Sequence, residues 1–110
     1  LDVSTGPGTH WTAVYIDMDT NEINYYDSYG EEPISYIKQF LINMYRKMEK
    51  INSNPIIIYN DKRHQFGFSE CGVFSMYFLF NRLTGKNMYD ISKQTITDKK
   101  MNDMRQKLFI

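Results

Sequence analysis

The sequence predicts a single α+β domain, residues 1–110, in which a buried helix packs on a small mixed or antiparallel sheet. Two neighbouring runs, 10–18 and 22–28, are rich in β-branched and aromatic residues and flank a polar turn, which is typical of a hairpin. Residues 73–83 are apolar almost all round, which is typical of a helix buried on every side. A chain of this length can bury one hydrophobic core.

The hairpin is expected to bring two titratable side chains together. His10 stands at the entrance of the first run, and Asp27 lies near the exit of the second. Residues 19–21 supply the polar side chains of the turn between them. Because antiparallel pairing joins the start of one strand to the end of the next, we expect His10 and Asp27 at the same end of the ribbon.

The segment after the hairpin is predicted to form an amphipathic helix and a third strand. Pro33 is expected at the first helical position, with Glu31 and Glu32 near the positive end of the helix dipole. Residues 52–55 end this helix, and the apolar run 56–59 is expected to be a strand buried within the sheet. The spacing of three and four predicts an inward stripe of Ile34, Ile37, Leu41, Met44 and Met48.

The last third of the chain is predicted to contain the buried helix and a second amphipathic helix. Ser69 is a candidate N-cap of the buried helix, and Gly85 is a candidate for its C-terminal cap. Residues 87–96 are expected to be irregular or to form one short turn. Residues 97–98 are typical of a helix start, and the inward stripe expected after them comprises Met101, Met104 and Leu108.

The composition narrows the classes of function. Thirteen basic and thirteen acidic residues leave no formal net charge, which argues against a nucleic-acid or anionic-membrane surface. No apolar run approaches membrane-spanning length. The single cysteine excludes an internal disulfide and favours an intracellular reducing compartment, the cytoplasm or the nucleus. One cysteine and two histidines do not fill a closed zinc site, so we expect no metal and no cofactor.

Cys71 stands at the predicted start of the buried helix. The unpaired amides and the dipole of a helix's first turn stabilise negative charge, which favours a thiolate at this position. That setting suits a cysteine nucleophile. The alternative is a structural cysteine, because a lone cysteine is often buried and behaves as a small apolar side chain.

Four residues could supply what a cysteine nucleophile requires, namely the thiol, a base, a group that orients the base and an oxyanion donor. These are Cys71, His10, Asp27 and Gln65, and their order and spacing resemble those of the ubiquitin-like-specific protease and adenovirus-proteinase clan of cysteine peptidases, the C48-like family. The resemblance extends over residues 10–82 and is carried by His10-Trp11 at a strand start, Tyr26-Asp27-Ser28, and Gln65 six residues before Cys71-Gly72.

The resemblance implies a papain-like cysteine-peptidase fold and cleavage of a peptide or isopeptide bond after glycine. It implies His10 as general base, Asp27 as the group that orients the imidazole, and Cys71 as the nucleophile. Gln65 would donate to the oxyanion together with the Cys71 N–H, and Trp11 would form one wall of a narrow substrate tunnel. The implied partner is a protein substrate, either a ubiquitin-like modifier or a viral polyprotein, with no nucleic acid and no membrane. For a viral protease, the virion is a second expected location besides the cytoplasm or the nucleus.

Several alternatives stay open. His10 and Asp27 could be a plain surface pair, Gln65 an ordinary loop amide, and Trp11 a core aromatic. His64 is a rival base, but nothing downstream orients it, so we expect a solvated loop histidine. The chain could also be a catalytically silent module that binds a ubiquitin-like protein, or a structural virion protein. The family's catalytic domain carries a substantial portion before its histidine strand, so residues 1–110 are expected to be the triad-bearing C-terminal part of that domain, and the alternative is a reduced member of the family.

Overall fold

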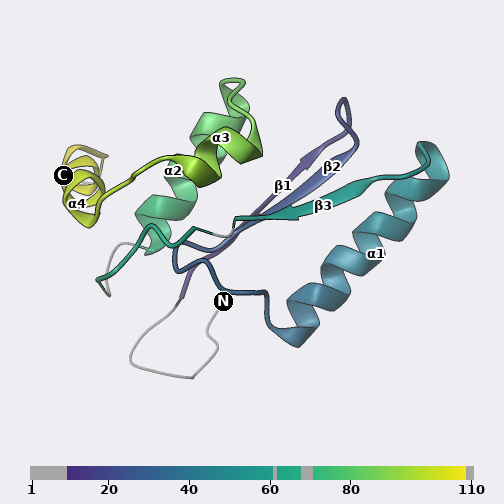
Figure 1. Cartoon of the computed structure of the whole chain (residues 1–110), viewed down its shortest axis with the longest axis horizontal. Coiled ribbons are helices and arrows are strands. Elements are labelled where there is room, and N and C mark those ends of the chain that lie inside the picture. The colour runs from purple at the N-terminus through teal and green to yellow at the C-terminus, as the bar shows by residue number, and fades with distance from the viewer. Residues whose placement is uncertain (1–9, 61, 68–70, 109–110) are drawn as a thin grey trace.

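A three-stranded mixed sheet lies at the centre of the molecule, with helices on both faces (Figure 1). The structure, a computed structural model, describes residues 10–60, 62–67 and 71–108. Strands β1 (Ala13–Asp17) and β2 (Glu22–Tyr26) pair antiparallel, with Ala13 opposite Tyr26. Strand β3 (Ile56–Tyr59) pairs parallel with β2, so β2 is the central strand. The predicted α+β class and the hairpin are confirmed.

Helix α1 (Ser35–Ile51) connects β2 to β3 and covers one face of the sheet (Figure 1). It begins at Ser35 and not at Pro33, because Ile34 keeps an extended backbone with ψ of 164°. The acidic residues 31–32 therefore lie outside its first turn, and Ile34 is exposed, which corrects the predicted start and the first stripe position. The rest of the stripe is confirmed, since it packs on β2 in a cluster of Ile23, Tyr25, Leu41 and Met48, with Ile37 and Met44 beside them.

Strand β3 lies at an edge of the sheet, and the expectation of a strand buried within the sheet is wrong. Ile56 and Tyr59 are exposed, and only the two central residues of the strand are half-buried. A parallel pair needs a long crossover, which α1 supplies, so β3 returns on the outer side of β2. Among the described residues no further strand pairs with it.

Helix α2 (Cys71–Leu83) packs on the other face of the sheet, and α3 (Met88–Lys93) and α4 (Asp98–Leu108) pack against α2 (Figure 1). The ring of Tyr26 stacks on Phe78, with ring centroids 4.9 Å apart and planes 6° apart. Alternate residues of β2 therefore serve two separate cores, one under each layer of helices. The core on this face comprises Ala13, Tyr26, Val73, Phe74, Phe78, Met88, Ile91, Ile96 and Met101.

The helix ends on this face follow local sequence signals. Gly85, at φ of +102°, lies just after α2, where its N–H and that of Lys86 donate to carbonyls of the last turn, so the predicted C-terminal cap is confirmed. Residues 88–93 form a six-residue helix whose cap is Asn87, where an irregular segment or a single turn was expected. Thr97 caps α4 as predicted, because its Oγ1 accepts from the N–H of Lys100. Ser69 and the side chain of Leu108 lie outside the described residues.

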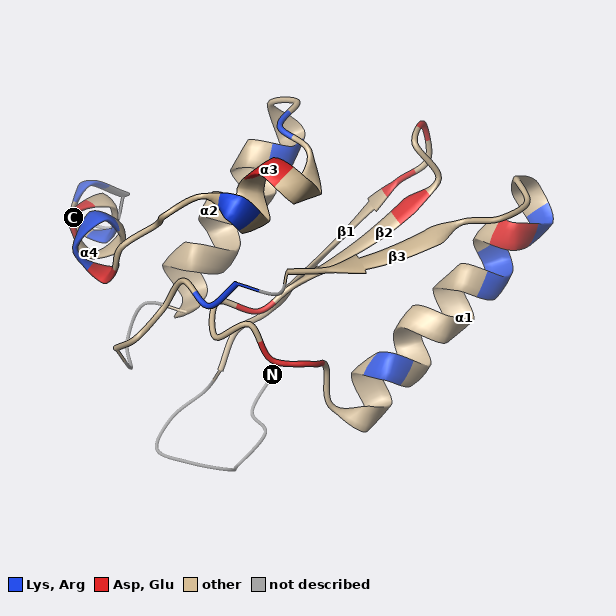
Figure 2. Ribbon diagram, viewed as in Figure 1, with Lys and Arg blue, Asp and Glu red and all other residues tan. Residues whose placement is uncertain are grey.

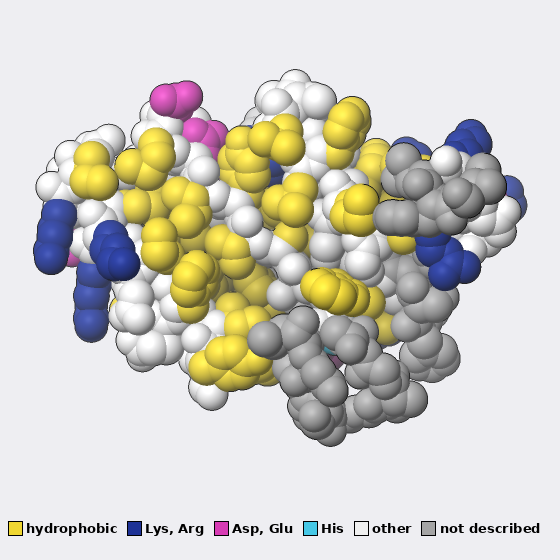
Figure 3. All heavy atoms as spheres, turned by 180° about the vertical axis from the view of Figure 1, so that it is seen from behind, with side chains coloured by type: hydrophobic (Ala, Val, Ile, Leu, Met, Phe, Trp, Pro, Cys, Tyr) yellow, Lys and Arg dark blue, Asp and Glu magenta, His cyan; other side chains and the backbone are white. Residues whose placement is uncertain are grey.

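One face of α2 is exposed, and the prediction of a helix buried on every side is wrong for that face. Met76, Phe80 and Leu83 recur at spacings of four and three, and Phe80 is 63% exposed. The strands β1 and β2 and the helices α3 and α4 pack on other sides of α2. Apolar side chains also spread over much of the face of the molecule that Figure 3 shows.

The charged residues of α1 are basic except for Glu49, whereas α4 carries residues of both signs (Figure 2). Inside the fold, Arg82 of α2 donates to Asp17 Oδ2 and to Asn24 Oδ1, both at 2.8 Å, which fastens the end of α2 to the hairpin. Within the described ranges, no helix combines the length and the apolar character that crossing a membrane requires.

Candidate active site

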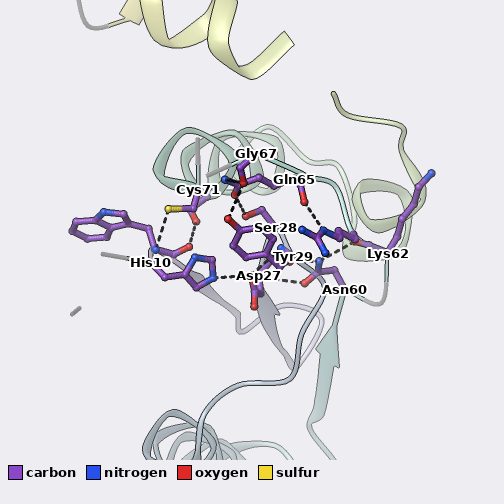
Figure 4. Close-up of polar contacts among 12 residues, drawn as sticks. His10, Asp27, Ser28, Tyr29, Asn60, Lys62, Gln65, Gly67 and Cys71 are labelled. Carbon is purple, nitrogen blue, oxygen red and sulfur yellow. Dashed lines mark hydrogen bonds and ion pairs between the residues drawn. The ribbon is translucent and has the colours of Figure 1, made fainter. Parts of the chain in front are cut away.

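The candidate site lies where four segments meet: the start of β1, the end of β2, residues 60 and 62–67, and the start of α2 (Figure 4). Antiparallel pairing, in which Ala13 lies opposite Tyr26, brings residue 10 to the end of the hairpin where residues 27 and 29 lie. Parallel pairing of Tyr25 with Tyr59 carries the chain after β3 to the same end. The strand pairing therefore assembles the site from residues that are far apart in the sequence.

His10 and Asp27 are in direct contact, as the hairpin predicted. The Nε2 of His10 lies 2.9 Å from Asp27 Oδ1, and the same oxygen accepts from the N–H of Tyr29 at 2.9 Å. A carboxylate only accepts, so Nε2 carries a proton, and Nδ1 is the basic nitrogen of the neutral imidazole. Asp27 is buried, which contradicts the alternative of a plain surface pair.

Cys71 is the first residue of α2, and its side chain is buried against the start of β1. Its Sγ accepts from the backbone N–H of Trp11 at 3.4 Å. That nitrogen belongs to the peptide bond that joins His10 to Trp11. The sulfur therefore contacts the backbone directly next to His10. Ser75, one turn further along α2, donates from Oγ to the carbonyl of Trp11 at 3.2 Å, which holds the strand start to the helix from a second point.

Trp11 lies over the first turn of α2 and faces solvent. Its side chain is 53% exposed, which contradicts the alternative of a core aromatic. A Cβ at Gly72 would lie 3.7 Å from the indole Cδ1, an ordinary van der Waals distance, so the ring lies next to the helix backbone at this position. The indole thus forms an exposed flat surface beside Cys71.

Gln65 is completely buried, at 0% exposure, and its amide is held at both ends. Its Oε1 accepts from Ser28 Oγ at 2.6 Å, and its Nε2 donates to the carbonyl of Gly67 at 3.1 Å. A side-chain amide has two N–H groups, so one remains after the bond to Gly67. This burial contradicts the alternative of an ordinary loop amide and fixes the direction of the donor.

His64 is buried, and the expectation of a solvated loop histidine is wrong. Its exposed fraction is 2%, its Nε2 lies 3.2 Å from the carbonyl of Ser92, and its Nδ1 lies 2.7 Å from the hydroxyl of Tyr26. Because a carbonyl only accepts, Nε2 carries the proton and Nδ1 accepts from the tyrosine. Burial lowers the pKa of His64. Both ring nitrogens are therefore engaged in hydrogen bonds between β2 and α3, which removes His64 as a rival base.

Asn60 is a site residue that sequence reasoning missed. It follows β3, its side-chain Oδ1 accepts from the backbone N–H of Asp27 at 2.9 Å, and its Nδ2 donates to the carbonyl of Asp27 at 2.6 Å. These two bonds continue the β2–β3 ladder by one residue and fix the backbone that carries the carboxylate. The signal in the sequence is a polar residue directly after a strand, but only the strand pairing shows what it binds.

Two further residues around Gln65 were also missed as site residues. Asp98, which the sequence marked only as a helix start, accepts through Oδ2 from the backbone N–H groups of Phe66 and Gly67, at 3.0 and 3.1 Å. Tyr29 stacks on the imidazole of His10, with ring centroids 5.0 Å apart, and its hydroxyl donates to Gly67 O at 2.8 Å. Across residues 10–60, 62–67 and 71–108, no three His, Cys, Asp or Glu side chains gather into a metal-binding cluster.

The arrangement can perform nucleophilic chemistry. A thiol on the first residue of a helix accepts from the backbone N–H that follows His10, and the imidazole of His10 is held through Nε2 by a buried carboxylate. A buried, oriented amide lies six residues before the thiol and belongs to the same site (Figure 4). Acyl transfer requires a nucleophile, a base, an orienting group and an oxyanion donor, and Cys71, His10, Asp27 and Gln65 are the candidates for these parts.

Comparison with known proteins points the same way. A sequence model described as the Ulp1 protease family, C-terminal catalytic domain, matches residues 4–110. The R355 protein of Acanthamoeba polyphaga mimivirus, whose name describes a thiol protease, is 32% identical over 94% of this chain and 34% of its own length. The cysteine protease S273R of African swine fever virus, Malawi tick isolate, is 32% identical over 98% of this chain and 41% of its own length.

Solved structures agree with these sequence relatives. The crystal structure of the selenomethionine form of the African swine fever virus pS273R protease superposes with a TM-score of 0.87 at 29% identity, over 97% of this chain and 40% of that one. A second crystal structure of that protease gives a TM-score of 0.84 at 27% identity, over 93% of this chain and 39% of that one. These similarities confirm the papain-like fold class, and the chain spans about two fifths or less of the length of each of these proteins.

Proposed function

The chain belongs to the Ulp1 protease family, in its C-terminal catalytic domain, and on that premise we propose that it is a cysteine peptidase in which Cys71, His10 and Asp27 carry the reaction. The observation that carries the proposal is the convergence around one sulfur. The N–H next to His10 contacts Cys71 Sγ, while the far side of the imidazole is held by buried Asp27. A binding module of the same fold would need none of these contacts.

The reaction begins with the thiol of Cys71. Nδ1 of His10 takes the thiol proton, because Nε2 is occupied by Asp27. The thiolate attacks the carbonyl carbon of the scissile bond, and the second N–H of Gln65 and the backbone N–H of Cys71 stabilise the oxyanion. His10 then gives its proton to the leaving amine, which departs and leaves a thioester on Cys71.

The second half of the reaction releases the acyl group. A water molecule gives one proton to Nδ1 of His10 and attacks the thioester carbonyl as the bond to sulfur breaks. Asp27 stabilises the imidazolium in both halves, because its Oδ1 stays paired with Nε2. The products are a free carboxylate on the substrate and the regenerated thiol.

The proposed substrate is a protein with glycine before the scissile bond. The exposed indole of Trp11 lies beside the first turn of α2, and an indole that formed one wall of a narrow substrate channel would favour a residue without a side chain. The S273R relatives include proteins named SUMO-1 cysteine proteases. We therefore propose a ubiquitin-like modifier or a viral polyprotein with such a site as the substrate class, cleaved at a peptide or isopeptide bond.

Activity-based probes test this function. SUMO-1 and ubiquitin carrying a C-terminal vinyl sulfone should form a covalent adduct that peptide mapping places on Cys71. The Cys71→Ala variant should form none, His10→Ala should form it at least tenfold more slowly, and Tyr89→Phe, an exposed residue of α3, should behave as wild type. Peptides from viral polyproteins with glycine at the cleaved bond distinguish the second substrate source.

The opposite result would support the catalytically silent module. Binding of the modifier without any adduct, together with Cys71 alkylation by iodoacetamide at equal rates in wild type and His10→Ala, contradicts the peptidase proposal. Equal alkylation rates would mean that the imidazole does not act on the sulfur, whatever the substrate.

A further inference from the structure

Tyr29 contacts both halves of the candidate site. Its backbone N–H donates to Asp27 Oδ1, and its ring stacks on the imidazole of His10 at 5.0 Å with planes 28° apart. Its hydroxyl reaches the other way and donates to the carbonyl of Gly67 at 2.8 Å. Figure 4 shows Tyr29 between the His10–Asp27 pair and the segment of Gln65 and Gly67.

The hydroxyl of Tyr29 and the amide of Gln65 share one acceptor. Gly67 O accepts from Tyr29 Oη at 2.8 Å and from Gln65 Nε2 at 3.1 Å. The direction of this carbonyl therefore restrains the Nε2 end of the Gln65 amide, whose Oε1 is held by Ser28. Asp98 holds the N–H of Gly67 from the opposite side, so the carbonyl is fixed by Tyr29 within an already anchored loop.

The ring of Tyr29 restrains the base. A stacked ring limits the tilt of the imidazole, and the Tyr29 N–H holds the oxygen that His10 Nε2 uses. The guanidinium of Arg63 lies 4.9 Å from the Tyr29 ring centroid and packs the ring in place. Burial and then the negative charges of Cys71 and Asp27 raise the pKa of the Tyr29 hydroxyl, which keeps it a donor.

We propose that Tyr29 is a positioning residue that sets the base through its ring and the oxyanion donor through its hydroxyl, so that one side chain aligns both halves of the site. The inference rests on the proposed function, since it assigns Tyr29 a part in that same reaction. It makes a separable claim for each end of the side chain, which two substitutions can test.

The first substitution, Tyr29→Phe, keeps the stacked ring and removes the hydroxyl. Turnover of a glycine-terminated modifier fused to a fluorogenic amine should fall about tenfold in kcat with KM within twofold, because the Gln65 donor loses its alignment. Alkylation of Cys71 by iodoacetamide needs the thiolate and no oxyanion donor. Its rate should therefore stay within twofold of wild type from pH 5 to pH 9.

The second substitution, Tyr29→Leu, removes both the ring and the hydroxyl. It should lower kcat further than Tyr29→Phe and should also change the pH dependence of Cys71 alkylation, because the imidazole is no longer restrained. Tyr89→Phe on the exposed side of α3 is the matched control and should leave both profiles unchanged. A purely structural tyrosine would lower the unfolding midpoint and leave the rates of the folded enzyme alone.

Two outcomes overturn the inference: unchanged kcat in Tyr29→Phe, or an alkylation profile that shifts equally in both variants. A failure of the proposed function is recognised separately, as absence of turnover and of probe adduct in wild type. In that case NMR signals of the His10 ring and the Gln65 side-chain amide show whether Tyr29 positions these two groups. Tyr29→Phe should move only the amide signal and Tyr29→Leu should move both, and any other pattern contradicts the positioning role.

Discussion

Replacing Gln65 with Glu separates the shape of the candidate oxyanion donor from its ability to donate. The variant keeps the length of the side chain and an oxygen that can accept from Ser28. It loses both N–H groups, and its second oxygen faces the carbonyl of Gly67, which lies 3.1 Å from Nε2 in the wild type. If Gln65 donates to the oxyanion, kcat should fall by about 10²–10³, equal to about 2.7–4 kcal/mol of transition-state stabilisation.

The same substitution should make stability depend on pH. Position 65 is completely buried, and burial raises the folded-state pKa of a carboxyl above its unfolded value of about 4.3. The folded state then holds its proton more tightly than the unfolded state, so stability is lost as pH rises from the unfolded pKa to the folded one. Each unit of difference costs about 1.4 kcal/mol, so a rise of two units removes about 2.7 kcal/mol at neutral pH.

Turnover assays and urea unfolding at pH 5 and pH 8 measure the two effects. Gln65→Met is the matched control, because it removes the donor without adding a charge. It should lose a similar factor in kcat, and its stability relative to wild type should not change between the two pH values. A Gln65→Glu enzyme with kcat within fivefold of wild type, or with equal destabilisation at pH 5 and pH 8, would refute the reasoning.

Three further substitutions probe the surroundings. Arg82→Met should destabilise by about 3–5 kcal/mol in urea unfolding, because Asp17 and Asn24 lose a buried donor. Burial alone would raise the pKa of Asp17, but its hydrogen bonds to Arg82 and to backbone N–H groups prevail and lower that pKa. The wild type should therefore lose stability as pH falls below about 4, and Arg82→Met should lose less stability over the same pH range. Burial lowers the pKa of His64 in the folded state, so as pH falls below about 6.5 the unfolded state binds a proton before the folded state does. The stability of the wild type should therefore decrease below that pH, and His64→Gln should remove this decrease. Asp98→Ala frees two loop N–H groups and should lower kcat about tenfold while costing about 1–3 kcal/mol of stability, and an unchanged kcat would exclude Asp98 from positioning the loop.

The parts of the fold that follow local rules were predictable from the sequence. The hairpin, the stripe of α1 and the caps at Gly85 and Thr97 depend on periodicity or on one residue's backbone preference. The errors concern the environment of an element, which periodicity does not encode. An apolar run such as 56–59 has the same pattern in a central strand and in an edge strand, and residues 73–83 show how much apolar surface α2 has without showing what covers it.

The candidate site divides in the same way. His10, Asp27, Gln65 and Cys71 could be predicted as candidates because their types and spacing fit the chemistry, and the contact between His10 and Asp27 is confirmed. Asn60 could not be found in this way, since its bonds to the backbone of residue 27 require the parallel pairing of β2 with β3.

The connection from residue 60 to residue 67 shows why activity and stability should respond differently to substitution. This segment contains no helix or strand in its described residues, yet it holds a completely buried amide. Its shape is set by hydrogen bonds with Ser28, Tyr29 and Asp98. None of these three residues belongs to either apolar core. Losing one such bond costs about 1–3 kcal/mol, which a folded domain can absorb, whereas a donor displaced from the oxyanion costs a factor of about a hundred or more in rate. Substitutions in this loop should therefore reduce kcat well before they reduce the folded population, and substitutions in the core under α1 should do the reverse.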